Sequence, residues 1–332
     1  MSSTQMVLST RMVKHMEKGS CILTVTFILI FASVVQAQHD PGRVKQNLLK
    51  GVVKILLPPD ESGDRRAGTG FLVSKEIAKN GQAYRQTFLV TTKHVLGDWN
   101  LADGDITRYH NKIEVFFYRT ATMSGRSYEP MKISLSDRNE KIKDKVYLHP
   151  NGKIDVAMIA LDEELDPSNR IDLTTFDVGD LLPFDKIISS NIGLGDQVFA
   201  IGYPLGITSL RDNYPFAKFG YVASLPGTQL VIEATWQNRK KEIIKTNAEG
   251  KIILLDGLIV VGNSGSPVVL PAEMKSRVNA ETNSLEWTPI KNQVIGIVSG
   301  GWSMAGLTVV YSSDYILELI DLFLKETPKK SN

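Results

Sequence analysis

The amino-acid sequence predicts an all-β fold that is followed by a single long helix. Short runs rich in valine, isoleucine, leucine and phenylalanine recur along most of the 332 residues, with glycine, proline, asparagine or aspartate between them. Many short strands at this spacing indicate a β-sandwich or β-barrel, because alternating β and α units would need helical segments between the strands. Only residues 312–328 have the periodicity of a long helix.

The strand-like runs fall into two groups of five, which predicts two β domains. A polar, turn-rich stretch at 162–192 separates the groups, and we place the boundary inside it, giving domains 38–175 and 176–332. Residues 271–293 interrupt the second group, and we expect them to form a long surface loop. In chain order the ten runs begin at Gly51, Gly70, Gln86, Ile113, Asp155, Gln197, Phe219, Gln229, Lys251 and Val294.

The helical segment has both of its expected end signals. Ser313 or Asp314 can cap its first turn, and Pro328 cannot continue a helix. One face is apolar, which predicts that the helix packs against a β domain instead of standing free in solvent. That face consists of Ile316, Leu319, Ile320 and Phe323.

The first 37 residues have the three parts of a secretory signal peptide. Arg11, Lys14 and Lys18 precede an apolar run at 21–37, which ends in the small residues of a cleavage site. We therefore expect cleavage between Ala37 and Gln38 and a periplasmic or secreted bacterial protein. The alternative is a retained membrane anchor, although the run is short for the roughly 30 Å of a bilayer core.

Removal of this segment leaves a mature chain with 35 basic and 35 acidic residues and no net charge. Such a balance gives no reason to expect nucleic acid or an anionic membrane surface as a partner, and no stable membrane insertion is expected after cleavage. The only cysteine, Cys21, lies in the removed segment, so disulfides, a cysteine nucleophile and thiolate metal ligands are excluded. No metal or organic cofactor motif is visible. The oligomeric state stays open.

The segment 261–267, "VGNSGSP", lies between two apolar runs and raises the question of Ser264. It could simply reverse the chain between strands, or it could present the serine hydroxyl as a nucleophile. A nucleophilic serine needs a general base, a group that orients the base, and hydrogen-bond donors for the oxyanion that forms. Gly262 would let the backbone N–H groups of residues 262 and 264 turn inward as these donors.

The remaining partners are His94 and Asp155. His94 follows the strand-like "TFLVTT" and begins a short helical turn, and Asp155 directly precedes the apolar "VAMIAL". Alone, each is a weak signal, because such a histidine is often structural and such an aspartate is a common turn residue. Together with Ser264 they have the chain order of the chymotrypsin-type catalytic triad. We expect the mature chain's other histidines, His39, His110 and His149, to take no part.

With these residues the chain resembles the bacterial trypsin-like serine peptidases, which have the chymotrypsin fold and include HtrA-type and glutamyl endopeptidases. The resemblance implies two six-stranded β-barrels, with His94 and Asp155 from the first and Ser264 from the second meeting in the cleft. Only 68 residues follow Ser264, so no PDZ domain is expected. The matching segments are "GTGFLVS" (68–74), "LVTTKHVL" (89–96), "DVAMIAL" (155–161), "FAIGYPLG" (199–206), "GYVASL" (220–225), "GNSGSPVV" (262–269) and "VIGIVSGG" (294–301).

Two positions depart from the common family pattern. Ser266 replaces a second glycine, as it does in glutamyl endopeptidases. Lys93 stands before the histidine where a small residue is commoner. If this ammonium pointed at the imidazole it would disfavour protonated His94, whereas an outward orientation would have no effect on the triad.

By resemblance, the substrate pocket is lined by Leu258 and Ile259 on one side and by Ser299, Gly300 and Gly301 on another. Leu258 occupies the position at which trypsins have an aspartate, and Val298 the position of the glutamyl endopeptidase histidine. A substrate charge buried in such an apolar pocket would have no partner, so we expect cleavage after uncharged, aliphatic or small residues.

These features predict an exported serine endopeptidase that hydrolyses protein or peptide substrates through an acyl-enzyme. The alternative is a catalytically silent trypsin-like domain that binds extended peptides in the cleft. An esterase of the α/β-hydrolase type is excluded, because its triad has a different chain order and its parallel sheet needs many helices.

Overall fold

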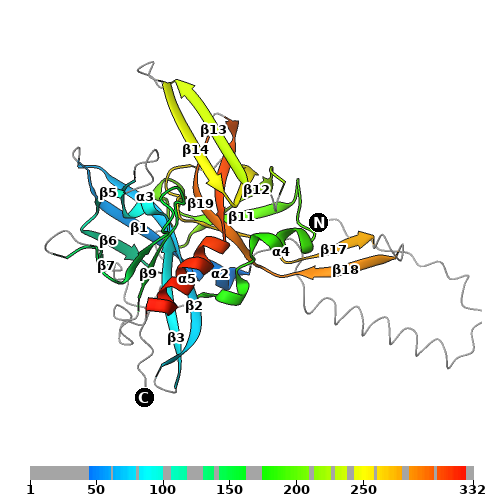
Figure 1. Cartoon of the computed structure of the whole chain (residues 1–332), viewed down its shortest axis with the longest axis horizontal. Coiled ribbons are helices and arrows are strands. Elements are labelled where there is room, and N and C mark those ends of the chain that lie inside the picture. The colour runs from blue at the N-terminus through cyan, green and yellow to red at the C-terminus, as the bar shows by residue number, and fades with distance from the viewer. Residues whose placement is uncertain are drawn as a thin grey trace, which may run out of the picture. The chain divides into compact units, whose positions relative to one another are not determined.

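In the computed structural model, nine of the ten predicted strands lie in two main sheets, and one helix packs against both (Figure 1). The tenth, which begins near Gln229, forms a separate hairpin. The described residues all lie in the unit Gly42–Asn332. The signal segment expected at 1–37 lies outside them. The structure describes residues 45–60, 63–79, 82–99, 106–117, 130–137, 142–161, 174–208, 213–225, 229–237, 243–257, 260–278, 284–302 and 305–326.

The first sheet has the order β7-β6-β1-β2-β3-β9-β8, with antiparallel neighbours throughout, and β10 (Phe176–Asp177) adds in parallel to β2. One bridge between Ser136 and Ile142 connects the segments beyond its two edge strands. Because no ladder joins the edge strands β7 and β8 in the described part of the chain, the sheet is a half-barrel there, and it differs from the closed six-stranded barrel that the resemblance implied. Its strands are β1 (Val52–Pro59), β2 (Arg65–Lys79), β3 (Gln82–Thr91), β6 (Lys112–Phe116), β7 (Met131–Ser134), β8 (Val146–Leu148) and β9 (Ala157–Ala160).

The second sheet closes into a six-stranded barrel in the order β11-β12-β15-β20-β19-β16. Its interior is filled by alternate side chains of these strands, among them Val198, Ile253, Val268 and Val310, all buried. Such burial stabilises a fold by about 1.5–3 kcal/mol for each large apolar side chain. The strands are β11 (Gln197–Gly202), β12 (Phe216–Val222), β15 (Ile252–Asp256), β16 (Pro267–Val269), β19 (Val294–Trp302) and β20 (Leu307–Ser312).

Three two-stranded hairpins add to the sheets (Figure 1). The prediction of a surface loop at 271–293 is wrong in part, because β17 (Glu273–Val278) and β18 (Leu285–Ile290) form an antiparallel pair there. Glu273 pairs with Ile290 at one end of this hairpin and Val278 with Leu285 at the other. In β18, Leu285 and Trp287 alternate with Glu286 and Thr288, which is typical of a strand, whereas three consecutive polar residues in β17 weaken that pattern. The other hairpins are β13 (Leu230–Gln237) with β14 (Ile243–Gly250), and β4 (Gly97–Trp99) with β5 (Ile106–Tyr109).

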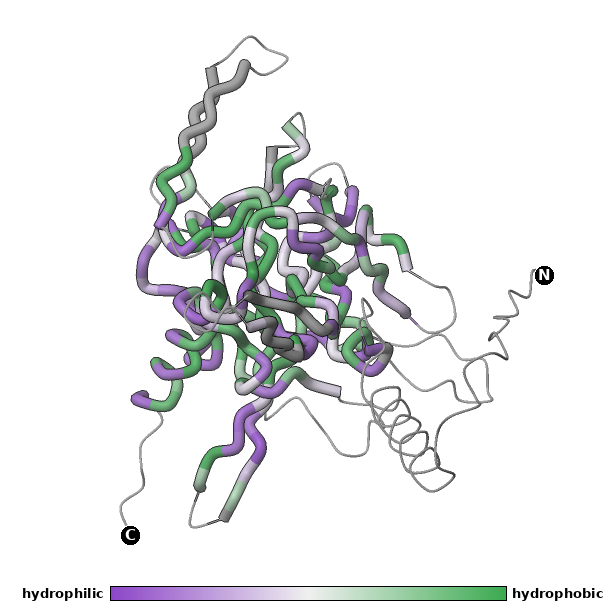
Figure 2. The backbone as a smooth tube through the Cα atoms, turned by 90° about the vertical axis from the view of Figure 1, so that its right-hand side faces the viewer, coloured by the Kyte–Doolittle hydropathy of each residue, from purple (hydrophilic) through white to green (hydrophobic). Residues whose placement is uncertain are grey.

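Figure 2 shows hydrophobic stretches within the body of the fold, whereas the projecting ends of β2 and β3 include several hydrophilic residues.

The helices of the described residues are short, apart from one. No helix among the described residues is long and apolar enough to cross a membrane. The helical segments are α2 (Gln46–Lys50), α3 (Lys93–Leu96), α4 (Phe184–Ser189) and α5 (Asp314–Glu326), with 3-10 turns η2 (Val178–Asp180) and η3 (Pro204–Gly206).

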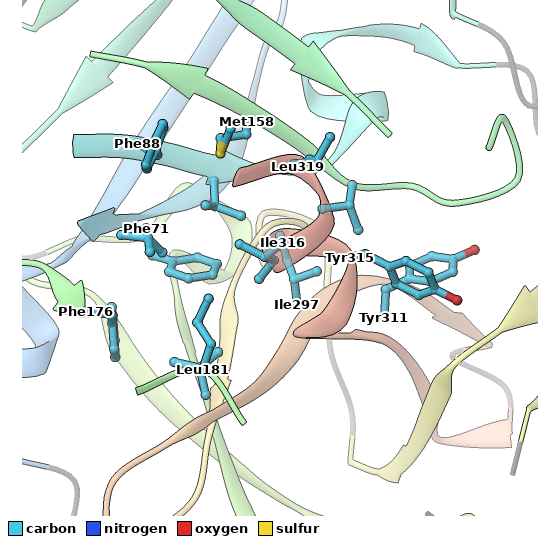
Figure 3. Packing of buried hydrophobic residues seen from close by; sticks show 14 of the residues in the cluster. Phe71, Phe88, Met158, Phe176, Leu181, Ile297, Tyr311, Tyr315, Ile316 and Leu319 are labelled. Carbon is cyan, nitrogen blue, oxygen red and sulfur yellow. The ribbon is translucent and has the colours of Figure 1, made fainter. Parts of the chain in front are cut away.

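The predicted C-terminal helix is confirmed as α5, and its apolar face joins the core between the two sheets. Ile316, Leu319 and Ile320 are buried beside Phe71, Phe88 and Met158 of the first sheet and Ile297 and Tyr311 of the second (Figure 3). The ring of Phe323 meets that of Phe88 edge to face at 5.0 Å between centroids. The all-β fold with two β units and a terminal helix is therefore confirmed.

The chain passes from one sheet to the other just after the expected boundary at 175/176. Phe176 and Asp177 still pair with Val73 and Ser74 of β2. Leu182 then donates its N–H to the carbonyl of Val294 in the second barrel. The two sheets are thus linked by a short, hydrogen-bonded crossover, which fixes the position of one against the other.

Candidate active site

His94 lies on the short helical turn α3, directly after the buried strand β3. The three residues before it, Thr91 to Lys93, are buried, so the end of the strand is anchored in the core. The His94 side chain itself is 31% exposed. Its ring stacks on Trp99 at 6.4 Å between centroids, with 29° between the planes. The imidazole is therefore held in one plane and stays partly accessible to solvent.

Asp155 is completely buried and faces His94. Its Oδ2 lies 2.6 Å from His94 Nδ1, and its Oδ1 accepts the backbone N–H of His94 at 3.2 Å. Burial would lower the pKa of His94, but the charge of Asp155 and its hydrogen bond with the ring outweigh burial. The pKa is therefore raised above its ordinary value of 6.5, although Arg66 opposes the rise. This pair can orient an imidazole and stabilise its protonated form.

Ser264 lies in a turn whose shape depends on two glycines. Gly262 and Gly265 have φ of +96° and +89°, which side chains rarely adopt. A Cβ at Gly262 would collide with the carbonyl of Tyr203, and one at Gly265 would collide with the carbonyl of Thr69. The sequence Gly-Asn-Ser-Gly is therefore required for this turn to lie so close to the neighbouring backbone.

Thr69 of β2 fixes this turn against the first sheet. Its N–H donates to the Ser264 carbonyl at 2.8 Å, and its Oγ1 donates to the Gly262 carbonyl at 2.7 Å. On the other side, Gly265 donates its N–H to Val298 of β19 at 2.8 Å. The serine turn is consequently held by both halves of the protein.

Ser299 connects the serine turn to the Asp155–His94 pair. Its Oγ donates to Asp155 Oδ2 at 2.5 Å, and its carbonyl accepts the Ser264 Oγ at 3.2 Å. The structure thus brings all three expected triad residues to one place. In this conformation, however, the Ser264 hydroxyl donates to Ser299 instead of to His94.

The backbone N–H groups of Gly262 and Ser264 are arranged differently from those of their neighbours. Asn263, Gly265 and Ser266 donate their N–H groups to Val260, Val298 and Asn263, respectively. Within the described ranges, no acceptor for the N–H groups of residues 262 and 264 is found. These two donors remain available for a ligand oxygen beside Ser264.

The expected pocket residues Ser299, Gly300 and Gly301 lie on β19. Gly300 and Gly301 pair with Val309 and Thr308 of β20, and a bulge interrupts this ladder at Ser299. On the opposite side, β16 pairs with β19 only from Val294 to Ile297. Among the strands described, none covers that edge of residues 299–301, so an extended peptide could pair there. Leu258 and Ile259 lie outside the described residues.

Lys93 points away from the imidazole. Its side chain is buried, and its Nζ donates to the carbonyls of Asn151 and Gly152 at 3.0 and 3.4 Å. Of the two orientations that the sequence left open, Lys93 therefore has the one away from the ring.

Among the other histidines, His149 is buried and its Nε2 lies 2.9 Å from Glu318 of α5.

Comparison with known proteins shows the family to which the chain belongs. A family model described as a trypsin-like peptidase domain matches residues 68–274. The chain belongs to this family. The predicted resemblance to trypsin-like peptidases is therefore confirmed, and with it the chymotrypsin-like class of the fold. No curated protein matches this trypsin-like peptidase.

Solved bacterial proteases resemble this trypsin-like peptidase at low sequence identity. The Rv3671c protease of M. tuberculosis in its active form is 15% identical, with a TM-score of 0.42 over 88% of this chain and 85% of that one. The serine endoprotease of Yersinia pestis is 14% identical, with a TM-score of 0.41 over 86% and 68%. The MamO protease domain of Magnetospirillum magneticum is 13% identical, with a TM-score of 0.41 over 83% and 98%.

Two contacts of this trypsin-like peptidase were not predicted from its sequence. The sequence placed Ser299 only in the substrate pocket and did not predict its bond to Asp155. Thr69 holds the serine turn, but nothing in the sequence around it predicts this contact. In the described part of the chain, no group of three His, Cys, Asp or Glu side chains is arranged to hold a metal.

Proposed function

We propose that this protein is a serine endopeptidase in which Ser264, His94 and Asp155 act as a catalytic triad. The observation that supports this most strongly is the buried Asp155 carboxylate, 2.6 Å from His94 Nδ1. This contact selects the tautomer that leaves Nε2 unprotonated, so Nε2 can accept the serine proton. Membership of the trypsin-like peptidase family makes peptide bonds the expected substrates.

In the proposed mechanism, the Ser264 hydroxyl first leaves the Ser299 carbonyl and turns toward His94. Its oxygen attacks the substrate carbonyl while His94 takes the proton, and the N–H groups of Gly262 and Ser264 bind the resulting oxyanion. His94 then protonates the leaving amine, which yields an acyl-enzyme. Water attacks this ester with His94 again as the base, and the serine is regenerated.

A fluorophosphonate probe tests this proposal, because it labels only activated serines. We expect the wild-type protein to be labelled and to hydrolyse casein, and Ser264→Ala to lose both properties. Ser266→Ala is the matched control, since it removes the neighbouring serine and should remain labelled. Loss of the triad nucleophile should lower kcat by several orders of magnitude. Normal turnover by purified Ser264→Ala would refute the assignment.

A catalytically silent peptide-binding domain is the second candidate function. It is favoured by one observation, the hydrogen bond that Ser264 Oγ donates to Ser299 instead of to His94. An unlabelled wild-type protein that binds extended peptides without cleaving them would support this function. Labelling of Ser264 would exclude it.

We further propose that the enzyme cleaves after uncharged residues. The proposal depends on Leu258 and Val298, which replace the charged residues of trypsins and glutamyl endopeptidases at these positions. The cut sites in a diverse peptide library, mapped by mass spectrometry, test it. A dominant preference for Arg, Lys or Glu before the cut would overturn the pocket assignment and leave the triad intact.

We also propose that the enzyme is exported after removal of residues 1–37. The basic residues, the apolar run and the small residues before Gln38 support this. Amino-terminal sequencing of protein recovered outside the cytoplasm should begin at Gln38. A membrane-bound chain that still contains residues 21–37 would instead support the retained anchor.

A further inference from the structure

The loop 149–155, which leads to Asp155, is held by groups from several directions. His149 at its start contacts Glu318 of α5, and Tyr311 of β20 donates its hydroxyl to the Lys153 carbonyl at 2.9 Å. From α3 and β4, Lys93 and Trp99 approach the middle of the loop. Trp99 Nε1 donates to the Gly152 carbonyl at 3.3 Å.

Lys93 is the unusual member of this set, because a lysine ammonium is rarely buried. Lys93 is only 3% exposed. Burial of an ammonium is costly unless hydrogen bonds replace its water. Here the carbonyls of Asn151 and Gly152 accept from Nζ at 3.0 and 3.4 Å. A hydrogen bond from a charged donor is stronger than one from a neutral donor, so this contact restrains the loop firmly.

The position of Lys93 in the sequence gives this contact a consequence for the candidate site. Lys93 and His94 are consecutive residues of α3, and Gly152 precedes Asp155 by three residues. The turn that carries the imidazole therefore also binds the loop that carries its carboxylate. Asp155 accepts from the His94 ring, from the His94 backbone and from Ser299, and these bonds require the loop in one position.

We propose that Lys93 is a positioning residue, which holds the loop 149–155 so that the Asp155 carboxylate stays on His94 Nδ1. This inference rests on the proposed function, because it assigns Lys93 a part in the same triad. It also accounts for a lysine where the family commonly has a small residue. A small side chain could not reach the carbonyls of Asn151 and Gly152.

If Lys93 acted on His94 through its charge alone, loss of Lys93 would change the pKa of His94 in the opposite direction. The charged groups that act on the His94 ring are Asp155, which raises its pKa, and Arg66 of β2, which lowers it. If Lys93 places Asp155, its loss lets the carboxylate move off the ring, and the pKa of His94 falls. If Lys93 acted as a nearby positive charge, its loss would raise that pKa.

The first experiment compares Lys93→Met with wild type and with Arg85→Met. Arg85 is a matched control, since its guanidinium also donates two hydrogen bonds to neutral oxygens, those of Ser74 and Thr175. For Lys93→Met we expect kcat to fall about 10- to 100-fold, because small displacements of catalytic groups cost this much. We expect KM to change less than about threefold, since substrate binding is untouched. Lys93→Arg keeps the charged donors and should recover part of the loss.

The second experiment measures the pKa of His94 by NMR titration in a Ser264→Ala background, with and without Lys93→Met. It needs no activity, so it tests the inference even if the proposed function fails. We expect a lower pKa without Lys93. An unchanged pKa, a higher pKa, or a kcat equal to that of Arg85→Met would overturn the inference. If Lys93→Met does not fold, Lys93→Gln, which keeps a polar side chain but lacks the ammonium, is titrated instead, and the same fall in the pKa of His94 is required.

Discussion

Gly202 and Ser266 form a pair of positions whose substitutions should be strongly coupled. Gly202 ends β11, and a Cβ added to it would collide with the Oγ of Ser266. The same Cβ would lie 2.9 Å from Thr69 Oγ1 and 3.0 Å from Asn263 Oδ1. Ser266 is completely buried, and its Oγ has no hydrogen-bond partner among the described residues. The serine hydroxyl thus occupies the space that a side chain at 202 would need.

The magnitudes follow from these contacts. Gly202→Ala should destabilise the wild-type protein by about 3 kcal/mol, at the upper end of overpacking costs, because the surrounding atoms are buried. Ser266→Ala removes an unsatisfied hydroxyl and should stabilise the protein by about 1 kcal/mol. In the Ser266→Ala background, Gly202→Ala loses its worst collision and should cost only about 1 kcal/mol. The coupling energy is then about 2 kcal/mol.

Urea unfolding of wild type, both single variants and the double variant measures this cycle. Substitutions at sites without a shared contact change the free energy of unfolding additively to within about 0.5 kcal/mol, which is well below the expected coupling. Equal costs of Gly202→Ala in the two backgrounds would show that the Ser266 hydroxyl does not fill this space. Because the assay measures only stability, the outcome is independent of the proposed activity.

Two further predictions concern pH. Asp314 accepts hydrogen bonds from Lys251 Nζ and from the Phe184 N–H. Burial would raise the pKa of Asp314, but these hydrogen bonds outweigh burial, so its pKa lies below the ordinary 3.8. Asp314→Asn should therefore cost about 2 kcal/mol at neutral pH, and urea unfolding should show this difference disappearing as pH falls through that lowered pKa. In the second, kcat/KM should rise with pH around a midpoint above 6.5, because His94 must be neutral and its pKa is raised; a maximum near pH ~4 would indicate a carboxylate mechanism.

The expected triad could be located from the sequence because each member adjoins a strand-like run. His94 follows one such run, Asp155 precedes another, and Ser264 lies between glycines that only a special turn requires. The continuous apolar residues in β3 and β9 predicted that these strands are buried, and they include buried residues in the structure. The positions of these residues along the chain therefore carried most of the information about where the site lies.

The contacts made by Ser299 and Lys93 could not be predicted in the same way. Ser299 reaches Asp155 across 144 residues, and no periodicity relates the two positions. For Lys93, the sequence left both orientations open, because one residue in a short turn reveals nothing about the direction of its side chain. These contacts depend on how the two sheets pack, which is decided by many apolar residues together.

The position of α5 has a consequence for the order in which the protein folds during translation. Phe88 and Tyr147 of the first sheet pack against Phe323, and His149 contacts Glu318. Part of the core of the first sheet therefore consists of side chains from α5, which is synthesised much later. A nascent chain usually folds its N-terminal domain first. Here, the first sheet leaves the ribosome with this apolar face uncovered, and it stays uncovered until α5 has been synthesised. The loop that leads to Asp155 likewise gains its contacts with Tyr311 and Glu318 only after these late residues have been synthesised.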